Sequence, residues 1–395
     1  MVLSPEKPLP FSIVEITGLV AEQEDGSLLL SASAGRELSP PLREPKGEKQ
    51  WERLLAAPAS REIFRSRAAV IAEIRKFFAK RGFLEVETPA LVATPGMEPY
   101  LTPFETELID PGGRRRRAHL ATSPEYALKK LLAAGFERVF ELARVFRNRE
   151  ALGGLHNPEF LMLEWYRAYA SYLEIMEDAE DLVRHLAKTV CGRQSFRVRG
   201  TTVNLGASWE RLSVAEAFQK YAAIDLEKNL AAAELRKTLR AKGYRPAESE
   251  RYEDLFFRVF LNEIEPCLGR KSPTILYDYP AELSALARRS ERDPRFAERF
   301  EIYIGGVELG NAFGELTDPA EQERRLLAEY ALRKKTGQRL FGPDQDFLDA
   351  LRTGLPPSGG IALGVDRLVM ILLEKERLED VRLFPAGEMF KKTTT

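Results

Sequence analysis

Two β-rich runs joined by a charged loop constrain the fold of this chain most. Residues 139–146 read VFELARVF and residues 160–169 read FLMLEWYRAY. The loop between them, 147–158, is rich in glycine and charge, so the second run predicts a strand that returns beside the first. The sequence therefore favours a sheet with antiparallel neighbours.

Further strands and helices alternate along the rest of the chain. Apolar residues at helical spacing predict an amphipathic helix over 60–81 that stops at Gly82. Other helices are expected at 123–135, 172–190, 228–243 and 366–376. Strands are expected at 83–89, 274–280, 299–316 and 359–365, and a hairpin at 101–121. This pattern predicts an α+β fold with a large antiparallel sheet flanked by helices, and not a doubly wound sheet.

The N-terminal region differs from the remainder in composition. Residues 11–35 predict a short β-meander with a Glu24-Asp25-Gly26 turn, and 37–50 have the proline and charge of a linker. We expect a small N-terminal β extension with its linker at residues 1–55 and one large domain at 56–395.

Charge balance limits the possible partners. The 395 residues include 59 basic and 60 acidic ones, with a net charge of −1. No global field can hold a polyanion, so any contact with nucleic acid or an acidic protein must be a local patch. The two cysteines have no zinc or redox spacing, and no apolar run reaches the roughly 20 residues of a membrane span. We expect a cytoplasmic protein that does not contact membranes.

The loop after the first strand contains candidates for phosphate binding. Arg147, Arg149, His156 and Asn157 all lie in it. Arginine at the end of a strand can donate two parallel hydrogen bonds to a phosphate. The alternative is a surface loop with salt bridges.

Two acids interrupt an apolar strand rich in small residues. Glu308 and Glu315 lie in VELGNAFGEL, where a carboxylate is costly unless a cation meets it. Two carboxylates commonly hold Mg²⁺ against phosphates. Positions seven apart face opposite sides of a regular strand, so a shared site requires a bulge, at Gly310 or Gly314. The alternative is two edge-strand carboxylates that face water.

Residues 359–367, GGIALGVDR, form neither common nucleotide loop. They lack the lysine and the Ser/Thr of a P-loop and the spacing of a dinucleotide fingerprint. Small residues alternate with aliphatic ones, and Arg367 begins the expected last helix. The pattern indicates a strand whose glycines let a ligand approach the backbone.

Together these segments resemble the three signature motifs of class II aminoacyl-tRNA synthetases, over roughly residues 58–390. GFLEVETPAL (82–91) with its preceding helix resembles motif 1, the dimer element; the Arg147 loop resembles motif 2; GGIALGVDR resembles motif 3. Class I signatures are absent. The segments TSPEYALKKLLAAG, HNPEFLMLEWY, ERFEIYIGGVELGNAFGEL and GLPPSGG are similar to the lysyl-tRNA synthetase branch.

The resemblance implies roles for individual residues and implies ATP and Mg²⁺. Arg147 would bind the α-phosphate, Arg367 would stack on adenine and reach the γ-phosphate, and Glu308 with Glu315 would hold Mg²⁺. The ATP side would comprise Arg147, Asn148, Arg149, Glu150, His156, Asn157, Glu308, Leu309, Gly364 and Arg367. The amino-acid side would comprise Ser123, Glu125, Glu164, Tyr166, Asn311, Glu315 and Ala362, and its carboxylates and aromatic ring suit a diamine.

Motif 2 departs from the family pattern in one respect. The family has Arg-x-Glu, with the glutamate near the adenine amine, whereas this chain has Arg147-Asn148-Arg149-Glu150. Either Glu150 takes that role through a loop one residue longer, or Arg149 changes the adenine contact. We favour Glu150.

Two features are similar to a narrower family, the elongation factor P (R)-β-lysine ligases, which are truncated lysyl-tRNA synthetase paralogues. The region before the catalytic core has too few strands and aromatic residues for an anticodon-binding barrel. Ala362 stands where lysyl-tRNA synthetases usually have glycine, although it could be merely a small strand residue. The resemblance implies adenylation of (R)-β-lysine or lysine, then transfer to a lysine of elongation factor P, by a homodimer that does not bind tRNA. A tRNA-charging enzyme and a non-catalytic regulatory paralogue are the alternatives.

The remaining basic and histidine residues have open roles. Arg114–Arg117 form the densest basic run, at the expected hairpin tip. They are either a solvated turn or a docking surface for an acidic partner protein or a tRNA backbone. His119 and His185 have no metal spacing, and we expect both to be structural.

Overall fold

The computed structural model describes residues 13–23, 28–39, 46–47, 49–97, 101–284 and 286–391. The chain divides into two compact units, Met1–Glu62 and Ile63–Thr395, which are described separately.

The first unit contains a two-stranded antiparallel sheet. Strands β1 (Ile13–Glu22) and β2 (Leu28–Ser39) pair along their whole length. Both strands of the predicted meander are therefore confirmed, and the predicted turn at 24–26 lies outside the described residues. The linker prediction began too early, because residues 37–39 pair with the start of β1. Helix α1 (Gln50–Ala56) and a 3₁₀ turn (Pro58–Arg61) follow.

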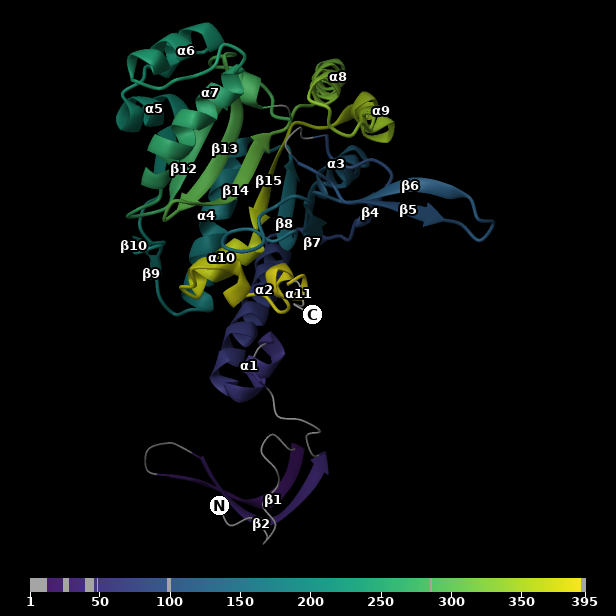
Figure 1. Ribbon diagram of the computed structural model, residues 1–395, viewed down its shortest axis with the longest axis vertical. Coiled ribbons are helices and arrows are strands. Elements are labelled where there is room, and N and C mark those ends of the chain that lie inside the picture. Colours follow the sequence, from purple (N-terminus) through teal and green to yellow (C-terminus); the bar gives the residue numbers. More distant parts are fainter. Residues whose placement is uncertain are drawn as a thin grey trace. The chain divides into compact units, whose positions relative to one another are not determined.

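An eight-stranded sheet forms the framework of the second unit (Figure 1). In spatial order its strands are β11 (Glu210–Ser213), β12 (Thr274–Pro280), β13 (Phe296–Ile304), β14 (Val307–Gly314), β15 (Ser358–Gly364), β8 (Glu159–Ala168), β7 (Arg138–Phe146) and β3 (Leu84–Glu85). Neighbours are antiparallel except at the two ends, where β11 runs parallel to β12 and β3 parallel to β7. The predicted α+β fold with a large antiparallel sheet is confirmed.

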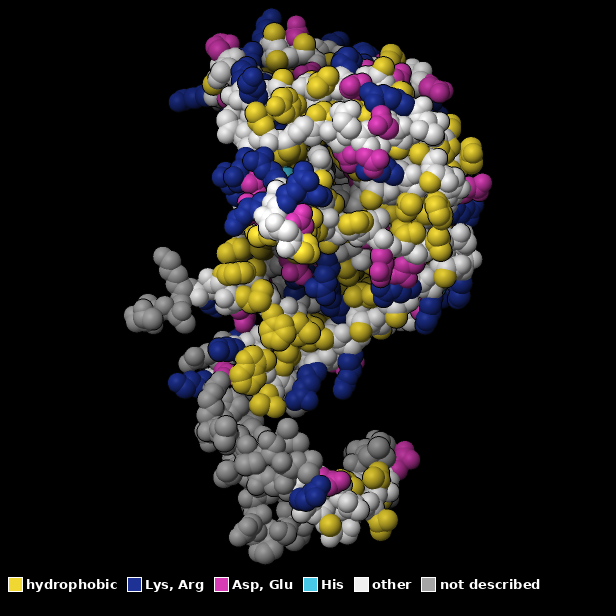
Figure 2. Space-filling view, turned by 90° about the vertical axis from the view of Figure 1, so that its right-hand side faces the viewer, with side chains coloured by type: hydrophobic (Ala, Val, Ile, Leu, Met, Phe, Trp, Pro, Cys, Tyr) yellow, Lys and Arg dark blue, Asp and Glu magenta, His cyan; other side chains and the backbone are white. Residues whose placement is uncertain are grey.

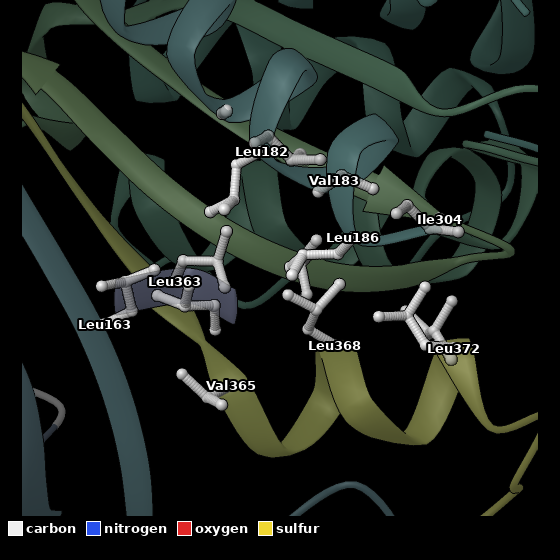
Figure 3. Close-up of a cluster of buried hydrophobic side chains, with 14 of the residues drawn as sticks. Leu163, Leu182, Val183, Leu186, Ile304, Leu363, Val365, Leu368 and Leu372 are labelled. Carbon is white, nitrogen blue, oxygen red and sulfur yellow. The ribbon is translucent and has the colours of Figure 1, made fainter. Parts of the chain in front are cut away.

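Three helices cover one face of this sheet. They are α2 (Glu62–Lys80), α4 (Tyr172–Thr189) and α10 (Val365–Leu372). Alternate strand residues such as Leu163 and Leu363 point toward them, and Leu182, Leu186 and Leu368 fill the space between α4, α10 and the sheet (Figure 3). Burial of each such leucine contributes about 1.5–3 kcal/mol. Strand residues of the opposite face pack against two further groups of helices.

The other helices form two groups beside the sheet (Figure 1). One group comprises α5 (Val214–Ala222), α6 (Ala232–Ala241), α7 (Tyr252–Val259) and a π-helical turn (Phe260–Ile264). The other comprises α3 (Glu125–Ala133), α8 (Pro319–Lys335) and α9 (Gln345–Gly354). Each group has its own apolar cluster. The first group packs on β11, β12 and β13, and the second packs on β7 and β8.

Small elements complete the second unit. A hairpin pairs β9 (Ser195–Val198) with β10 (Thr201–Asn204). A three-stranded sheet has the order β4 (Leu91–Val92), β6 (Arg115–Leu120), β5 (Glu105–Ile109). Short turns occur at Leu226–Lys228, Glu265–Cys267, Ala281–Leu283 and Leu378–Asp380, and α11 (Ala386–Met389) lies near the C-terminus.

The strand expected at 83–89 is shorter in the structure. Only Leu84–Glu85 and Leu91–Val92 are strands, and they belong to different sheets. Between them the backbone N–H of Thr88 donates to the Glu141 carboxylate at 3.0 Å, and Pro89 has no N–H to donate. A side-chain acceptor and a proline therefore end the strand pairing early. Within the part of the chain that is described, none of the helices has the length and apolar character that crossing a membrane requires.

Candidate active site

A cavity of about 660 Å³ opens on the sheet face opposite α2, α4 and α10. Its floor comes from β8, β14 and β15, because side chains alternate between the two faces of a strand. The predicted residues that line it are Ser123, Glu125, Arg147, Glu150, His156, Asn157, Glu164, Tyr166, Glu308, Leu309, Asn311, Ala362, Gly364 and Arg367. The cavity therefore brings residues from distant motifs to one place.

A row of directly paired residues crosses the cavity floor. Glu301 on β13 pairs with Asn311 on β14, Asn311 with Ala362 on β15, and Ala362 with Glu164 on β8. Directly paired residues have Cβ atoms about 5 Å apart on one face of a sheet. The methyl group of Ala362 therefore lies between the amide of Asn311 and the carboxylate of Glu164.

Ser123, Glu125, Glu164 and Tyr166 line one end of the cavity. The predicted substrate residue Glu315 does not line it but is fully buried beside Tyr166 and Gly360. We call these five residues the carboxylate pocket. Helix α3 positions the first part, since the Ser123 hydroxyl accepts a hydrogen bond from the N–H of Glu125 at 3.0 Å. The same hydroxyl donates to Glu164 at 2.6 Å, and the Tyr166 hydroxyl donates to the other oxygen of Glu164 at 3.0 Å. The pocket thus orients Glu164 from both sides.

The sequence analysis missed Lys129, which lies against this pocket. Its ammonium forms ion pairs with Glu125 and, at 2.6 Å, with Glu315. The Lys129 side chain is 1% exposed and that of Glu315 is fully buried. The i,i+4 spacing of Glu125 and Lys129 on one helix was the available signal. Three acids and one lysine therefore share the pocket, and the protonation of the acids sets its charge.

Burial and mutual repulsion change the titration of these acids. Burial, followed by the charge of Glu125, raises the pKa of Glu164 to about 8. Burial raises the pKa of Glu315 to about 7, although Lys129 opposes the rise. Burial acts to lower the pKa of Lys129, but Glu125 and Glu315 outweigh it and the net shift is upward. A cationic ligand would stabilise the ionised carboxylates.

Gly360 on β15 is required by close packing. A Cβ atom at this position would lie 2.2 Å from the Tyr166 ring and 2.7 Å from an oxygen of Glu315. By contrast, a Cβ atom on Gly364 would meet nothing closer than 3.7 Å. Gly360 therefore lets Tyr166 and Glu315 approach each other across the strand.

The other end of the cavity holds the motif 2 loop and the start of α10. Arg147 extends over the ring of Phe160, 5.1 Å from its centroid, and its buried Nε has no hydrogen-bond partner among the described residues. Arg367 donates to the carbonyl of Glu308 at 2.8 Å and lies 3.4 Å from its carboxylate. Arg147 is thus a cation at the cavity whose Nε is free to donate, and its charge helps to lower the pKa of Glu150.

The departure in motif 2 has a structural counterpart. Glu150 lines the cavity and its carboxylate lies 2.9 Å from the Nδ1 of His156. That hydrogen bond lowers the pKa of Glu150. Arg149 has a φ of 62°, and both Arg149 and Asn148 are exposed and do not line the cavity. The geometry favours Glu150 over Arg149 for contact with a ligand.

Asn157 has a structural position within the cavity wall. Its side-chain amide donates to the carbonyl of Glu159 at 2.6 Å and accepts from the N–H of Ala386 at 3.1 Å. These bonds connect the motif 2 loop to α11. Its polar atoms are therefore already engaged by the protein.

The two acids predicted to share one cation do not lie together. Glu315 follows the end of β14 and is buried against Lys129, whereas Glu308 lies at the start of β14 beside Arg367. Seven residues of strand separate them by on the order of 20 Å, although β14 does contain an irregularity near Glu308. The predicted pairing is therefore corrected: Glu315 belongs to the carboxylate pocket.

Glu301 on β13, the strand paired with β14, also lines the cavity, as Glu308 does. It accepts hydrogen bonds from Tyr279 and Tyr303, each at 2.5 Å, and pairs with Arg299 at 2.6 Å. Nearby, burial and then the charges of Glu308 and Glu301 raise the pKa of Glu265 to about 7. Among the described residues no group of three or more His, Cys, Asp or Glu side chains could hold a metal by itself. Two carboxylates can suffice for Mg²⁺ when substrate phosphates provide further oxygens.

A largely antiparallel sheet presents one arginine from the loop between β7 and β8 and another from α10, which follows β15, and this is the catalytic fold of class II aminoacyl-tRNA synthetases. The chain belongs to the family described as tRNA synthetases class II (D, K and N), whose model matches residues 46–388.

Curated relatives share much of this sequence. The chain is 34% identical to a lysine–tRNA ligase of Carboxydothermus hydrogenoformans over 388 residues, which covers 94% of this chain and 78% of the relative. It is 35% identical to a lysine–tRNA ligase of Oceanobacillus iheyensis, with 94% and 77% covered. It is 38% identical to that of Moorella thermoacetica over 335 residues, with 84% and 66% covered.

Proposed function

We propose that this protein activates (R)-β-lysine, or lysine, as an adenylate at the expense of ATP and transfers the acyl group to a lysine side chain of elongation factor P. The observation that supports this choice of acyl substrate is the position of Ala362 between Asn311 and Glu164 on the cavity floor. A methyl group there narrows the space beside Glu164 and disfavours an α-amino group. The relatives named lysine–tRNA ligases support a lysine-type substrate.

The carboxylate pocket would bind the ammonium groups of the substrate. Glu164 is held by Ser123 and Tyr166, so its oxygens are oriented before the ligand arrives. This preorganisation lowers the entropic cost of binding. The substrate carboxylate would then extend toward Arg147 at the other end of the cavity.

Activation follows from this placement. The substrate carboxylate attacks the α-phosphorus of ATP and pyrophosphate leaves. The Nε of Arg147 has no hydrogen-bond partner among the described residues, so Arg147 can offset the developing negative charge, while Glu150 binds the adenine side. An uncharged lysine amine of the acceptor then attacks the adenylate carbonyl, an amide bond forms and AMP leaves. Positioning and electrostatics account for catalysis without a side-chain base.

Mg²⁺ would be held by Glu308 together with Glu301, which replaces Glu315 in the earlier interpretation. The bound ion would neutralise phosphate charge. After burial, the charges of Glu308 and Glu301 both act to raise the pKa of Glu265, so the two proposed ligands lie close enough to one group to act on it together.

The motif 1 resemblance supports a homodimer built on α2 and β3. Sedimentation of the pure protein at micromolar concentration should give the mass of two chains. A monomer at that concentration would contradict this part of the proposal.

Exchange of radioactive pyrophosphate into ATP tests the activation step. We expect exchange with (R)-β-lysine to exceed exchange with (S)-β-lysine and α-lysine. Mass spectrometry of elongation factor P after incubation then tests transfer. The expected product has one lysine side chain whose mass has increased by that of one acyl group. No exchange with any of the three would exclude the catalytic proposals and favour a regulatory paralogue.

A tRNA-charging activity is the second candidate, because the curated relatives are named lysine–tRNA ligases. Acid-stable charging of lysine tRNA by the pure protein, with no transfer to elongation factor P, would support this candidate over the first.

A further inference from the structure

An arginine-rich hairpin extends from the rim of the active-site cavity. We define the arginine arm as Arg114–Arg117 on the β5–β6 hairpin together with Arg339 after α8. A surface hollow of about 380 Å³ lies here, lined by Glu105, Thr106, Glu107, Arg115, Arg116, Arg117 and Arg339. Figure 2 looks onto the side from which this hairpin projects and shows Lys and Arg side chains gathered there.

The arginine arm has more arginines than the acidic side chains around it can pair with. Arg115 binds Glu107 at 2.7 Å, and Arg339 binds Glu105. Within the described ranges, the side chains of Arg114 and Arg116 have no carboxylate partner, and both are exposed. Two arginines are therefore available to a ligand with carboxylates or phosphates.

The backbone connects the arm to the motif 2 loop. The N–H of Asn148 donates to the carbonyl of Thr102 at 2.7 Å, and the two residues form a β-bridge. Leu101, next to Thr102, lines the cavity. Because each residue of a β-strand adds about 3.3 Å, the tip of the hairpin lies roughly 25 Å from this bridge. A macromolecule bound along the arm is thus held beside the cavity mouth.

We propose that the arginine arm docks an acidic face of the protein whose lysine receives the acyl group. This inference rests on the proposed function and adds the surface through which the acceptor is recognised. Docking would raise the local concentration of the acceptor lysine at the cavity, and charge complementarity would accelerate encounter.

The composition of the arm favours a protein over an RNA backbone. Glu105, Glu107 and Asp110 interrupt the positive charge, so the arm offers no continuous track for phosphates. Leu108 and Ile109 on β5 are 48% and 53% exposed, and apolar side chains suit a protein surface. β5 is also an edge strand of its sheet, whose free backbone groups can pair with an extended segment.

The charge-reversal variant Arg114→Glu/Arg116→Glu tests the proposal in the full-length protein. Its matched control is Lys237→Glu/Arg245→Glu, which reverses two exposed cations on and after α6, in the other helix group. Two rates are measured for each protein: pyrophosphate exchange with (R)-β-lysine, and acylation of purified elongation factor P at about 50 mM and about 300 mM salt.

We expect the arm variant to retain wild-type exchange and to lose about tenfold in kcat/KM for elongation factor P at low salt. The difference should shrink at high salt, and Arg114→Ser/Arg116→Ser should lose less. The control should match the wild type in both assays. Unchanged acylation by the arm variant at both salt concentrations would overturn the proposal.

The outcome separates this inference from the proposed function. If the wild-type protein acylates no elongation factor P but charges lysine tRNA, the proposed function fails. The arm is then tested with tRNA, and a charging defect confined to the arm variant would identify an RNA contact and overturn the docking of an acidic protein.

Discussion

The ammonium of Lys129 lies 2.6 Å from the carboxylate of Glu315, and both side chains are buried at the end of the cavity. Lys129 also pairs with Glu125 one helical turn earlier. One internal cation therefore binds two acids of the carboxylate pocket, which would otherwise repel each other. This relationship sets the charge that a substrate ammonium meets.

Replacing Lys129 with Met should destabilise the protein and weaken substrate binding. Removal of one partner from a buried ion pair costs about 3–5 kcal/mol, because the remaining charge is left unpaired. We expect the free energy of unfolding, measured by urea titration, to fall by this amount. The KM for the amino acid should rise, without a matching change in the KM for ATP. Lys130→Met is the control, since Lys130 pairs with Asp344 and Asp346 near the surface and should cost at most about 1 kcal/mol.

Glu164 should give the protein a specific pH dependence. Its pKa rises from an ordinary value of 4.5 to about 8 in the folded chain, so folding favours the protonated form. That stabilisation is complete below about pH 4.5 and is lost as the pH rises through about 8. The free energy of unfolding of the wild type relative to Glu164→Gln should therefore fall across this range. A constant difference from pH 5 to 8.5 would show that Glu164 is ionised throughout.

Ala362→Gly should broaden the choice of acyl substrate. Loss of the methyl group opens space between Asn311 and Glu164, and one methyl group is worth about 1–3 kcal/mol of discrimination. We expect the ratio of kcat/KM for α-lysine to that for (R)-β-lysine to rise about tenfold in the exchange assay. An unchanged ratio would show that Ala362 does not limit the pocket.

Two glycines of β15 should differ sharply in their tolerance of alanine. Gly360→Ala places a methyl group 2.2 Å from the Tyr166 ring, so the ring must move and Glu164 loses a hydrogen-bond donor. We expect a raised KM for the amino acid and a lower melting temperature. Gly364→Ala is the control, because its nearest neighbour is 3.7 Å away. Equal effects in the two variants would contradict this account.

If Glu301 and Glu308 hold Mg²⁺, variants of Glu301 and Glu315 should have different kinetic effects. Glu301→Gln should raise the Mg²⁺ concentration needed for half-maximal exchange, because a proposed ligand is lost. Glu315→Gln should instead raise the KM for the amino acid and leave the Mg²⁺ requirement unchanged. If Glu315→Gln alone altered the Mg²⁺ requirement, Glu301 would not be the partner of Glu308.

Local patterns predicted the central strands well. The runs at 139–146 and 160–169 became β7 and β8, and helix 60–81 became α2. Helix α8 was not expected, because its surface is mostly polar and carries little helical periodicity of apolar residues. A cap stabilises the start of such a polar helix, and the Asp318 side chain accepts from two backbone N–H groups at the start of α8.

The sequence by itself determined the antiparallel sheet and most residue types of the cavity, because strand alternation and glycine placement are local properties. Only the tertiary structure decided which acids act together. Glu308 and Glu315 are close in sequence, but the strand holds them apart, and the neighbouring chain segments bring Glu301 to one and Lys129 to the other. Strand pairing and helix packing join residues that are distant along the chain, so charge balance at the site could not be predicted from spacing alone.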